Sequence, residues 1–341
     1  MTKTIVYDRD FEELEIKPSD LIKHYRRLLD QEVHDRLATA GSLHIRNCPG
    51  CQANMGQSVF EKSGLTYVEC PRCQTVYASP CPSDEDLIHF YREAKAPRFW
   101  REHFYQQTKA MRRRKIYQPQ ASWTLTVLDR FRPHPALGID LGYHSRLFFE
   151  TLAAQEKGLF AIVAANPVAD IECADLTLNA VTVRPTPLAE FSTLGPADII
   201  FMFEVLDRYA DVEALFSAIS DVLAPGGLVL TSTTSISGFD LQVLWDRSES
   251  IYPPDRLNLL STEGLTQLAS RHGFEILEFS TPGMFDVDVV RRALKRNEDV
   301  PCSRFVRYLL QNRNEQALHE FQAYLQQNRL SSFARLVLRK E

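Results

Sequence analysis

The sequence has no apolar run long enough to cross a membrane, and its acidic first residues lack the apolar core of a secretory peptide. It has no excess of basic charge either, and a net charge of −5 argues against binding nucleic acid by charge alone. Internal repeats and low-complexity tracts are also missing. These absences predict a cytoplasmic protein without a membrane span and make nucleic acid an unlikely partner.

The composition of the 341 residues is that of an ordinary globular protein, with 44% hydrophobic and 24% charged residues. This balance excludes wholesale disorder. The length allows two domains, one of them with a sizeable core.

Four of the seven cysteines form two close pairs, Cys48-Pro-Gly-Cys51 and Cys70-Pro-Arg-Cys73, separated by 18 residues. Two such turns bring four thiolates together in a tetrahedron, and the intervening segment can form a short hairpin. The spacing therefore predicts a structural zinc ribbon with Cys48, Cys51, Cys70 and Cys73 as ligands. With no open coordination position, the metal would stabilise the fold and take no part in chemistry. A redox role for either pair is the alternative.

Helical segments surround this ribbon on both sides in the chain. A helix begins near Lys17-Pro-Ser19, and we expect its apolar face to pack on the body of the protein and its basic face to lie in solvent. The N-terminal helices could also contact a protein partner. A second stretch runs from Pro97 to the basic run Met111-Arg-Arg-Arg-Lys115. Basic residues interleaved with aromatic ones can hold a phosphate or a charged acceptor, although such runs also form solvated helix faces.

Strands and helices alternate from Trp123 onward, which predicts a mostly parallel α/β sheet. The expected strands are 137–141, 159–164, 181–183, 197–203, 228–231, 274–279 and 332–338. The expected helices are 147–155, 212–223, 262–272, 287–296 and 304–328. We divide the chain into a helical segment (1–47), the ribbon (48–82), a helical connector (83–130) and an α/β domain (131–341) with a helical insertion at about 287–330.

The first strand ends at Asp140-Leu-Gly142, where an acidic residue and a glycine precede a helix. This is the outline of a nucleotide-binding turn, because glycine lets a cofactor approach the backbone and the free N–H groups of the helix.

Leu223-Ala-Pro-Gly-Gly-Leu-Val-Leu230 follows a predicted helix, and Asp198–Leu206 precedes that helix. Together they resemble class I S-adenosylmethionine-dependent methyltransferases. Tyr77–Ser83, Asn258–Gly264 and Ser280–Val287 extend the resemblance to bacterial methyltransferases with an N-terminal zinc ribbon, which include sugar- and cell-envelope-modifying enzymes. The resemblance implies a Rossmann-like sheet, mostly parallel with an antiparallel last strand.

The resemblance also implies a site. Asp140, Gly142, Asn166 and Glu204 would line S-adenosylmethionine, and a small-molecule or sugar-type acceptor would enter over the carboxyl ends of the strands. If the acceptor is a hydroxyl it needs a base, and Asp207 and Asp255 are the candidates.

The sequence departs from the family pattern at residues that face the ligand. His144 and Arg146 stand at the later glycine places of the first loop, and Asn166 stands where an acidic residue usually binds the ribose. Arg208 and Arg256 replace histidines. The resemblance implies methyl transfer. Because of these departures, a catalytically inactive binding or scaffold protein that has lost or altered cofactor binding is the alternative. A further alternative is a basic pocket of Arg146, Arg208 and Arg256 that binds a phosphate-bearing ligand.

Overall fold

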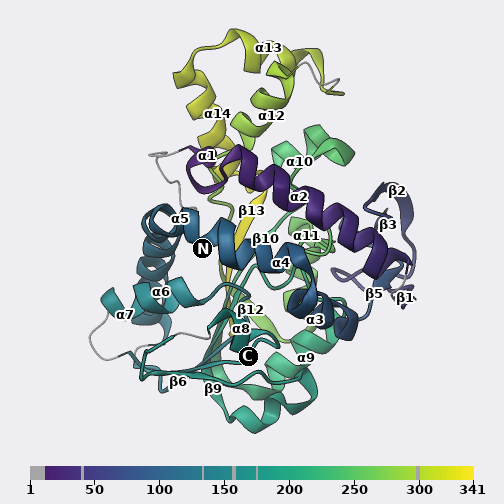
Figure 1. Ribbon diagram of the computed structural model, residues 1–341. Helices are drawn as coiled ribbons and strands as arrows, with labels where there is room; N and C mark the ends of the chain where they lie inside the picture. Colours follow the sequence, from purple (N-terminus) through teal and green to yellow (C-terminus); the bar gives the residue numbers. More distant parts are fainter. Residues whose placement is uncertain (1–11, 40–41, 133, 156–158, 174–175, 297–299) are drawn as a thin grey trace.

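The structure, a computed structural model of the chain, describes residues 12–39, 42–132, 134–155, 159–173, 176–296 and 300–341. Its centre is a seven-stranded sheet in the order β12-β13-β10-β9-β6-β7-β8 (Figure 1). The strands are β6 (Leu137–Asp140), β7 (Ala161–Ala164), β8 (Val181–Val183), β9 (Ala197–Phe203), β10 (Leu223–Thr234), β12 (Phe274–Ser280) and β13 (Phe333–Lys340).

The pairing of these strands confirms the predicted fold class. Strands β8, β7, β6, β9 and β10 pair in parallel, whereas β13 runs antiparallel to both of its neighbours, β10 and β12. Each parallel pair needs a crossover connection, and the helices that form these connections cover the faces of the sheet. The result is the Rossmann-like arrangement with an antiparallel last strand.

Alternating side chains of β9 divide the core between the two faces of the sheet. Ile199 and Phe201 pack with α6 (Gln118–Phe131) and α7 (Arg146–Gln155), whereas Ile200 and Met202 pack with α9 (Val212–Val222) and α11 (Thr262–Arg271). A strand that is buried on both faces reads as a continuous apolar run, and 197–203 is such a run. Short segments η4 (Leu188–Leu194) and α8 (Ala169–Glu172) complete the connections.

Helices from the N-terminal part lie against the sheet domain. They are α1 (Glu13–Ile16), α2 (Ser19–Val33), η1 (His34–Thr39), α3 (Asp84–Glu93), α4 (Lys95–Phe99), η2 (Trp100–Phe104), α5 (Tyr105–Arg112) and η3 (Arg113–Tyr117). Figure 1 shows α2 beside α4, and the buried face of α2 includes Tyr25 and Leu29. The apolar face of α2 thus packs on the body of the protein, as the sequence predicts.

A helical insertion lies between β12 and β13 and has its own small core (Figure 1). It contains α12 (Asp286–Lys295), α13 (Arg304–Asn312) and α14 (Glu315–Gln327), and it packs on α10 (Phe239–Leu244), which continues into η5 (Trp245–Arg247). The single helix predicted over 304–328 is wrong. The chain breaks after Asn312 because the side chain of Asn314 accepts a hydrogen bond from Ala317 N and starts a new helix.

The ribbon forms a second sheet in the order β11-β4-β3-β2, with β2 (Gln57–Lys62), β3 (Leu65–Glu69), β4 (Val76–Ala78) and β11 (Asn258–Leu259). Strand β11 comes from the α/β part of the chain, so the two parts share a sheet. A short pair, β1 (Leu43–His44) and β5 (Cys81–Pro82), borders the ribbon. Within the described residues, no helix is both long enough and apolar enough to cross a membrane.

Candidate cofactor site and zinc centre

Asp140 ends strand β6 and is almost fully buried, with 1% of its surface exposed. Gly142 N donates to Asp140 Oδ2 over 3.2 Å, whereas Oδ1 is buried and has no hydrogen-bond partner in the described structure. Burial raises the pKa of Asp140 to about 7, an effect that hydrogen bonds from Ser145 and Gly142 only partly offset. Among the described residues, the carboxylate thus has no positively charged partner.

His144 and Arg146 replace glycines in the first loop, and both are held by nearby carboxylates. Nδ1 of His144 lies 3.0 Å from Glu172 Oε2 on α8. Arg146 Nε donates to Glu150 Oε1 on its own helix α7 over 3.0 Å. These contacts hold the two bulky side chains toward α8 and α7, and neither contact includes Asp140.

Asn166, which follows β7, is fully buried and connects two turns. Its Nδ2 donates to Leu141 O over 2.7 Å, and its Oδ1 accepts from Val168 N over 2.9 Å. The amide therefore braces the turns after β6 and β7. To accept a ribose hydroxyl, it would have to give up one of these bonds. Its assignment to the cofactor stays a prediction.

Glu204 follows β9 with a backbone φ of +55°, a conformation that is uncommon outside glycine and recurs at functional sites. Its side chain is 47% exposed and lies 3.6 Å from both Arg208 and Arg256. Burial alone would raise its pKa, but the charges of Arg256 and Arg208 outweigh it and lower the pKa to about 2. Glu204 is therefore an ionised carboxylate at the edge of the sheet.

The two candidate bases are buried within a network of charges. Asp207 is completely buried, accepts hydrogen bonds from Thr233 and Thr234, and lies 3.2 Å from Arg256. Burial raises the pKa of Asp207. In this arrangement it could take a proton from an acceptor only by losing some of these partners.

Asp255 is buried in the same network. It accepts hydrogen bonds from Tyr25 (2.6 Å) and Tyr91 (2.8 Å), and Arg208 Nε lies 3.0 Å away. Burial would raise the pKa of Asp255, but Arg208 and the tyrosine hydroxyls lower it overall. Because these tyrosines come from α2 and α3, the N-terminal helices contact the network at this edge of the sheet. Sequence reasoning missed both tyrosines, since nothing local marks them as partners of Asp255.

The three arginines of the basic pocket considered from the sequence are all engaged with carboxylates. Arg208 and Arg256 converge near Glu204, but Arg146 is bonded to Glu150. The charges of Arg208 and Arg256 are also matched by three carboxylates, Glu204, Asp207 and Asp255. A phosphate would therefore find little uncompensated positive charge there.

The four paired cysteines meet in one buried cluster, with all Sγ atoms within 4.8 Å of one another. Cys48 Sγ lies 3.5 Å from Cys73 Sγ, and Cys51 Sγ lies 3.4 Å from Cys70 Sγ. Thiolates around a tetrahedral zinc lie about 3.8 Å apart. The cluster therefore fits a zinc ion with four protein ligands and no open position.

The two cysteine turns have the same backbone geometry. Cys48 N donates to Ala53 O, and Cys70 N donates to Thr75 O, each over 2.9 Å. The residue after each second cysteine, Gln52 or Gln74, has a positive φ, 59° and 61° respectively. This repetition orients both turns toward one point, as a shared metal requires.

The α/β domain holds the second cysteine turn directly. The hydroxyl of Ser261 donates to Cys73 O, and Ser261 N donates to Thr75 Oγ1 over 3.2 Å. On the first turn, Arg271 Nη1 donates to Gly50 O over 2.9 Å. Both contacts come from α11 or its cap, so the zinc cluster is docked on this helix.

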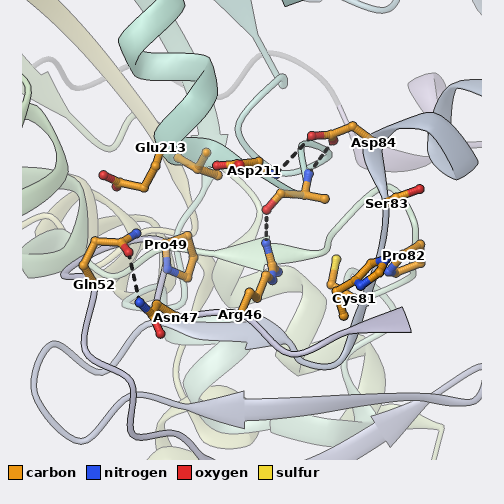
Figure 2. A pocket seen from close by; sticks show the side chains of 13 residues that line it. Arg46, Asn47, Pro49, Gln52, Cys81, Pro82, Ser83, Asp84, Asp211 and Glu213 are labelled. Carbon is orange, nitrogen blue, oxygen red and sulfur yellow. Dashed lines mark hydrogen bonds between the residues drawn. The ribbon is translucent and has the colours of Figure 1, made fainter. Parts of the chain in front are cut away.

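A cavity of about 560 Å³ lies where the ribbon meets the start of α9 (Figure 2). The guanidinium of Arg46 donates to three backbone carbonyls there, including Ala210 O at 2.7 Å. Asp84 accepts from the backbone N–H groups of Ala210 and Asp211. These charged groups hold the ribbon against the α/β domain, and none of the predicted cofactor residues lines the cavity.

Comparison with known proteins agrees with this architecture. Residues 111–279 match a family profile described as "Methyltransferase domain", which spans β6 to β12. No curated protein matches the chain. This match covers just under half of the chain and indicates a class I S-adenosylmethionine-dependent methyltransferase domain within residues 111–279, a kind of domain that implies S-adenosylmethionine as the methyl donor.

Solved structures that resemble the chain include three transferases of low identity. The plantazolicin methyltransferase BamL is 13% identical, with 74% of this chain and 94% of that chain covered and a TM-score of 0.46. The N-methyltransferase NodS from Bradyrhizobium japonicum is 14% identical, with coverages of 65% and 95% and a TM-score of 0.37. The cyclopropane synthase MmaA2 from Mycobacterium tuberculosis is 13% identical, with coverages of 65% and 84% and a TM-score of 0.39.

Proposed function

We propose that this chain, whose methyltransferase domain includes residues 111–279, transfers a methyl group from S-adenosylmethionine to a small-molecule or sugar-type acceptor. The observation that supports the proposal is the uncompensated carboxylate of Asp140. It lies beside Gly142 at the end of β6, and its free Oδ1 suits a donor such as the ammonium group of the cofactor.

Asp140, Gly142 and Glu204 would hold the cofactor. Strands β6 and β9 are adjacent and parallel, so Asp140 and Glu204 follow strands that end at the same edge of the sheet. Bound S-adenosylmethionine supplies a methyl group that is already activated as a sulfonium. The protein then has to align a nucleophile with that group and exclude water. The N-terminal helices provide the cover, through Tyr25 and Tyr91.

A second candidate function is a non-catalytic binding or scaffold module, in which the ribbon and the N-terminal helices contact a partner. The observation that favours it is the engagement of Asn166 by Leu141 and Val168, which leaves no acidic group at the usual ribose position.

Isothermal titration with S-adenosylmethionine separates the two candidates. We expect binding to the native protein and weaker binding to Asp140→Asn, which keeps the shape of the side chain but removes the charge. If the native protein shows no heat of binding at millimolar S-adenosylmethionine, the methyltransferase proposal is wrong. If His144→Gly with Arg146→Gly then created binding that the native protein lacks, the non-catalytic candidate would be favoured.

A further inference from the structure

Arg112, the last residue of α5, is a buried cation, with 8% of its surface exposed. Its Nε donates to Thr108 Oγ1 over 3.0 Å, and its Nη2 donates to Ile16 O over 3.1 Å. No carboxylate in the described part of the chain forms an ion pair with it. A buried charge is costly unless it is paired, so the missing counter-ion calls for an explanation.

Aromatic rings surround this cation on one side. The guanidinium carbon lies 5.1 Å from the ring centre of Trp100, 5.5 Å from that of Phe104 and 6.0 Å from that of Tyr105. Cation–π attraction compensates part of the charge. The indole Nε1 of Trp100 is itself buried without an acceptor in the described structure. Arg112 and Trp100, which we call the donor shelf, thus combine an unpaired cation with an unsatisfied donor.

The donor shelf borders the first loop of the cofactor crevice. The Trp100 ring lies 5.7 Å from that of His144, and the hydroxyls of Tyr105 and Tyr117 donate to His144 O over 3.4 and 3.3 Å. The positive charge of Arg112 also contributes to the lowered pKa of Glu204, the residue that follows β9. The shelf therefore lies near the residues that follow β6 and β9, and it is built from η2 and α5 of the N-terminal part.

We infer that the donor shelf binds an anionic oxygen group, a carboxylate or phosphate, of a ligand seated in the crevice. Guanidinium and indole N–H groups both donate hydrogen bonds, and an oxyanion accepts from both while it neutralises the buried charge. The inference deepens the proposed function and rests on it, because the ligand is either the cofactor, through its own carboxylate, or an anionic methyl acceptor. It also gives a role to Arg112, one of the two buried cations of the basic run Met111–Lys115.

The test compares Arg112→Gln with Arg114→Gln, a control in the same run whose side chain is exposed. The probes are S-adenosylhomocysteine, its decarboxylated counterpart, which has the same thioether but no carboxylate, and inorganic phosphate, each titrated by calorimetry. If the anion is the cofactor's carboxylate, Arg112→Gln binds S-adenosylhomocysteine about ten- to a hundredfold more weakly, and the decarboxylated analogue is unaffected. If the anion instead belongs to the methyl acceptor, Arg112→Gln weakens the binding of phosphate to protein that is saturated with S-adenosylhomocysteine. Arg114→Gln changes neither.

A second measurement uses the native protein and does not depend on how the variant folds. The indole N–H signal of Trp100, assigned by its loss in Trp100→Phe, should shift in nuclear magnetic resonance spectra when S-adenosylhomocysteine or phosphate binds. If neither probe moves this signal, the inference is overturned, and it is also overturned if folded Arg112→Gln binds both probes like the native protein. A native protein that fails to bind S-adenosylhomocysteine contradicts the proposed function instead, and the phosphate arm then decides the inference alone.

Discussion

At the scale of single residues, the carboxyl edge of the sheet contains two kinds of buried charge. Asp255 is matched within the chain by Arg208, Tyr25 and Tyr91. Asp140 has no charged partner among the described residues, and its Oδ1 accepts no hydrogen bond there. A buried charge that is matched contributes to a fixed structure, whereas one that is unmatched costs free energy until a ligand or a proton arrives. Unmatched groups are therefore the better guide to a binding site.

Replacement of Asp140 by asparagine should stabilise the protein at neutral pH. The folded pKa of about 7 lies above the unfolded value of about 3.9, so the folded state binds the proton more tightly. The native protein should therefore lose stability relative to Asp140→Asn as pH rises from about 4 through the folded pKa, by at most about 4 kcal/mol, and the difference should level off above about pH 8. Urea unfolding at several pH values measures the difference.

Asp198 offers a control of opposite sign. Burial would raise its pKa, but Arg132 and two backbone N–H groups lower it. Asp198→Asn should therefore be less stable than the native protein above pH 4, and the gap should narrow as pH falls below that value. A gap between native protein and Asp140→Asn that stays constant from pH 4 to 7 would contradict the unpaired state of Asp140.

At the scale of elements, the sequence predicted most strands of the central sheet. It did not predict contacts between segments that are far apart in the chain. Local sequence signals exist for the apolar run 197–203 and for the motif Asp140–Gly142. A strand that is buried on both faces and a turn before a helix are both recognisable from consecutive residues. Strand β11 has none, since it forms only by pairing Asn258 and Leu259 with the distant strand β4. The hydrogen bond from Tyr25 to Asp255 spans 230 residues, so the burial of a candidate base was equally hidden.

The contact between the ribbon and α11 should be sensitive to a single methyl group. A Cβ on Gly264, in the first turn of α11, would collide with Thr75 Oγ1, and Gly50 of the first cysteine turn lies against the same glycine. Gly264→Ala should therefore destabilise the protein by about 1–3 kcal/mol, even though alanine favours helices. Thermal unfolding checks this, with Thr266→Ala on the exposed side of α11 as control. Equal stability of the two variants would show that the ribbon shifts to make room for the methyl group without a loss of unfolding free energy.

At the scale of the whole molecule, the ribbon is part of the framework of the α/β domain. Its sheet includes β11, Ser261 bonds to the second cysteine turn, and Arg271 bonds to the first. The segment that contains β11 also carries Asp255 and Arg256, which lie at the crevice. The zinc cluster and the cofactor crevice are thus connected through a few residues of one chain segment, and the loss of one should affect the other.

Removal of zinc should accordingly destabilise the whole protein. We expect one zinc ion per chain, because the described cysteines form a single four-thiolate cluster, and structural zinc sites of this kind contribute folding free energy directly. A strong chelator or Cys70→Ser should lower the melting temperature in one cooperative transition, followed by circular dichroism, since the ribbon and α11 unfold together. Cys302→Ser, outside the cluster and partly exposed, should keep both zinc and melting temperature. Two separate transitions, the second at the melting temperature of the native protein, would instead mean that the α/β domain is stably folded without the ribbon.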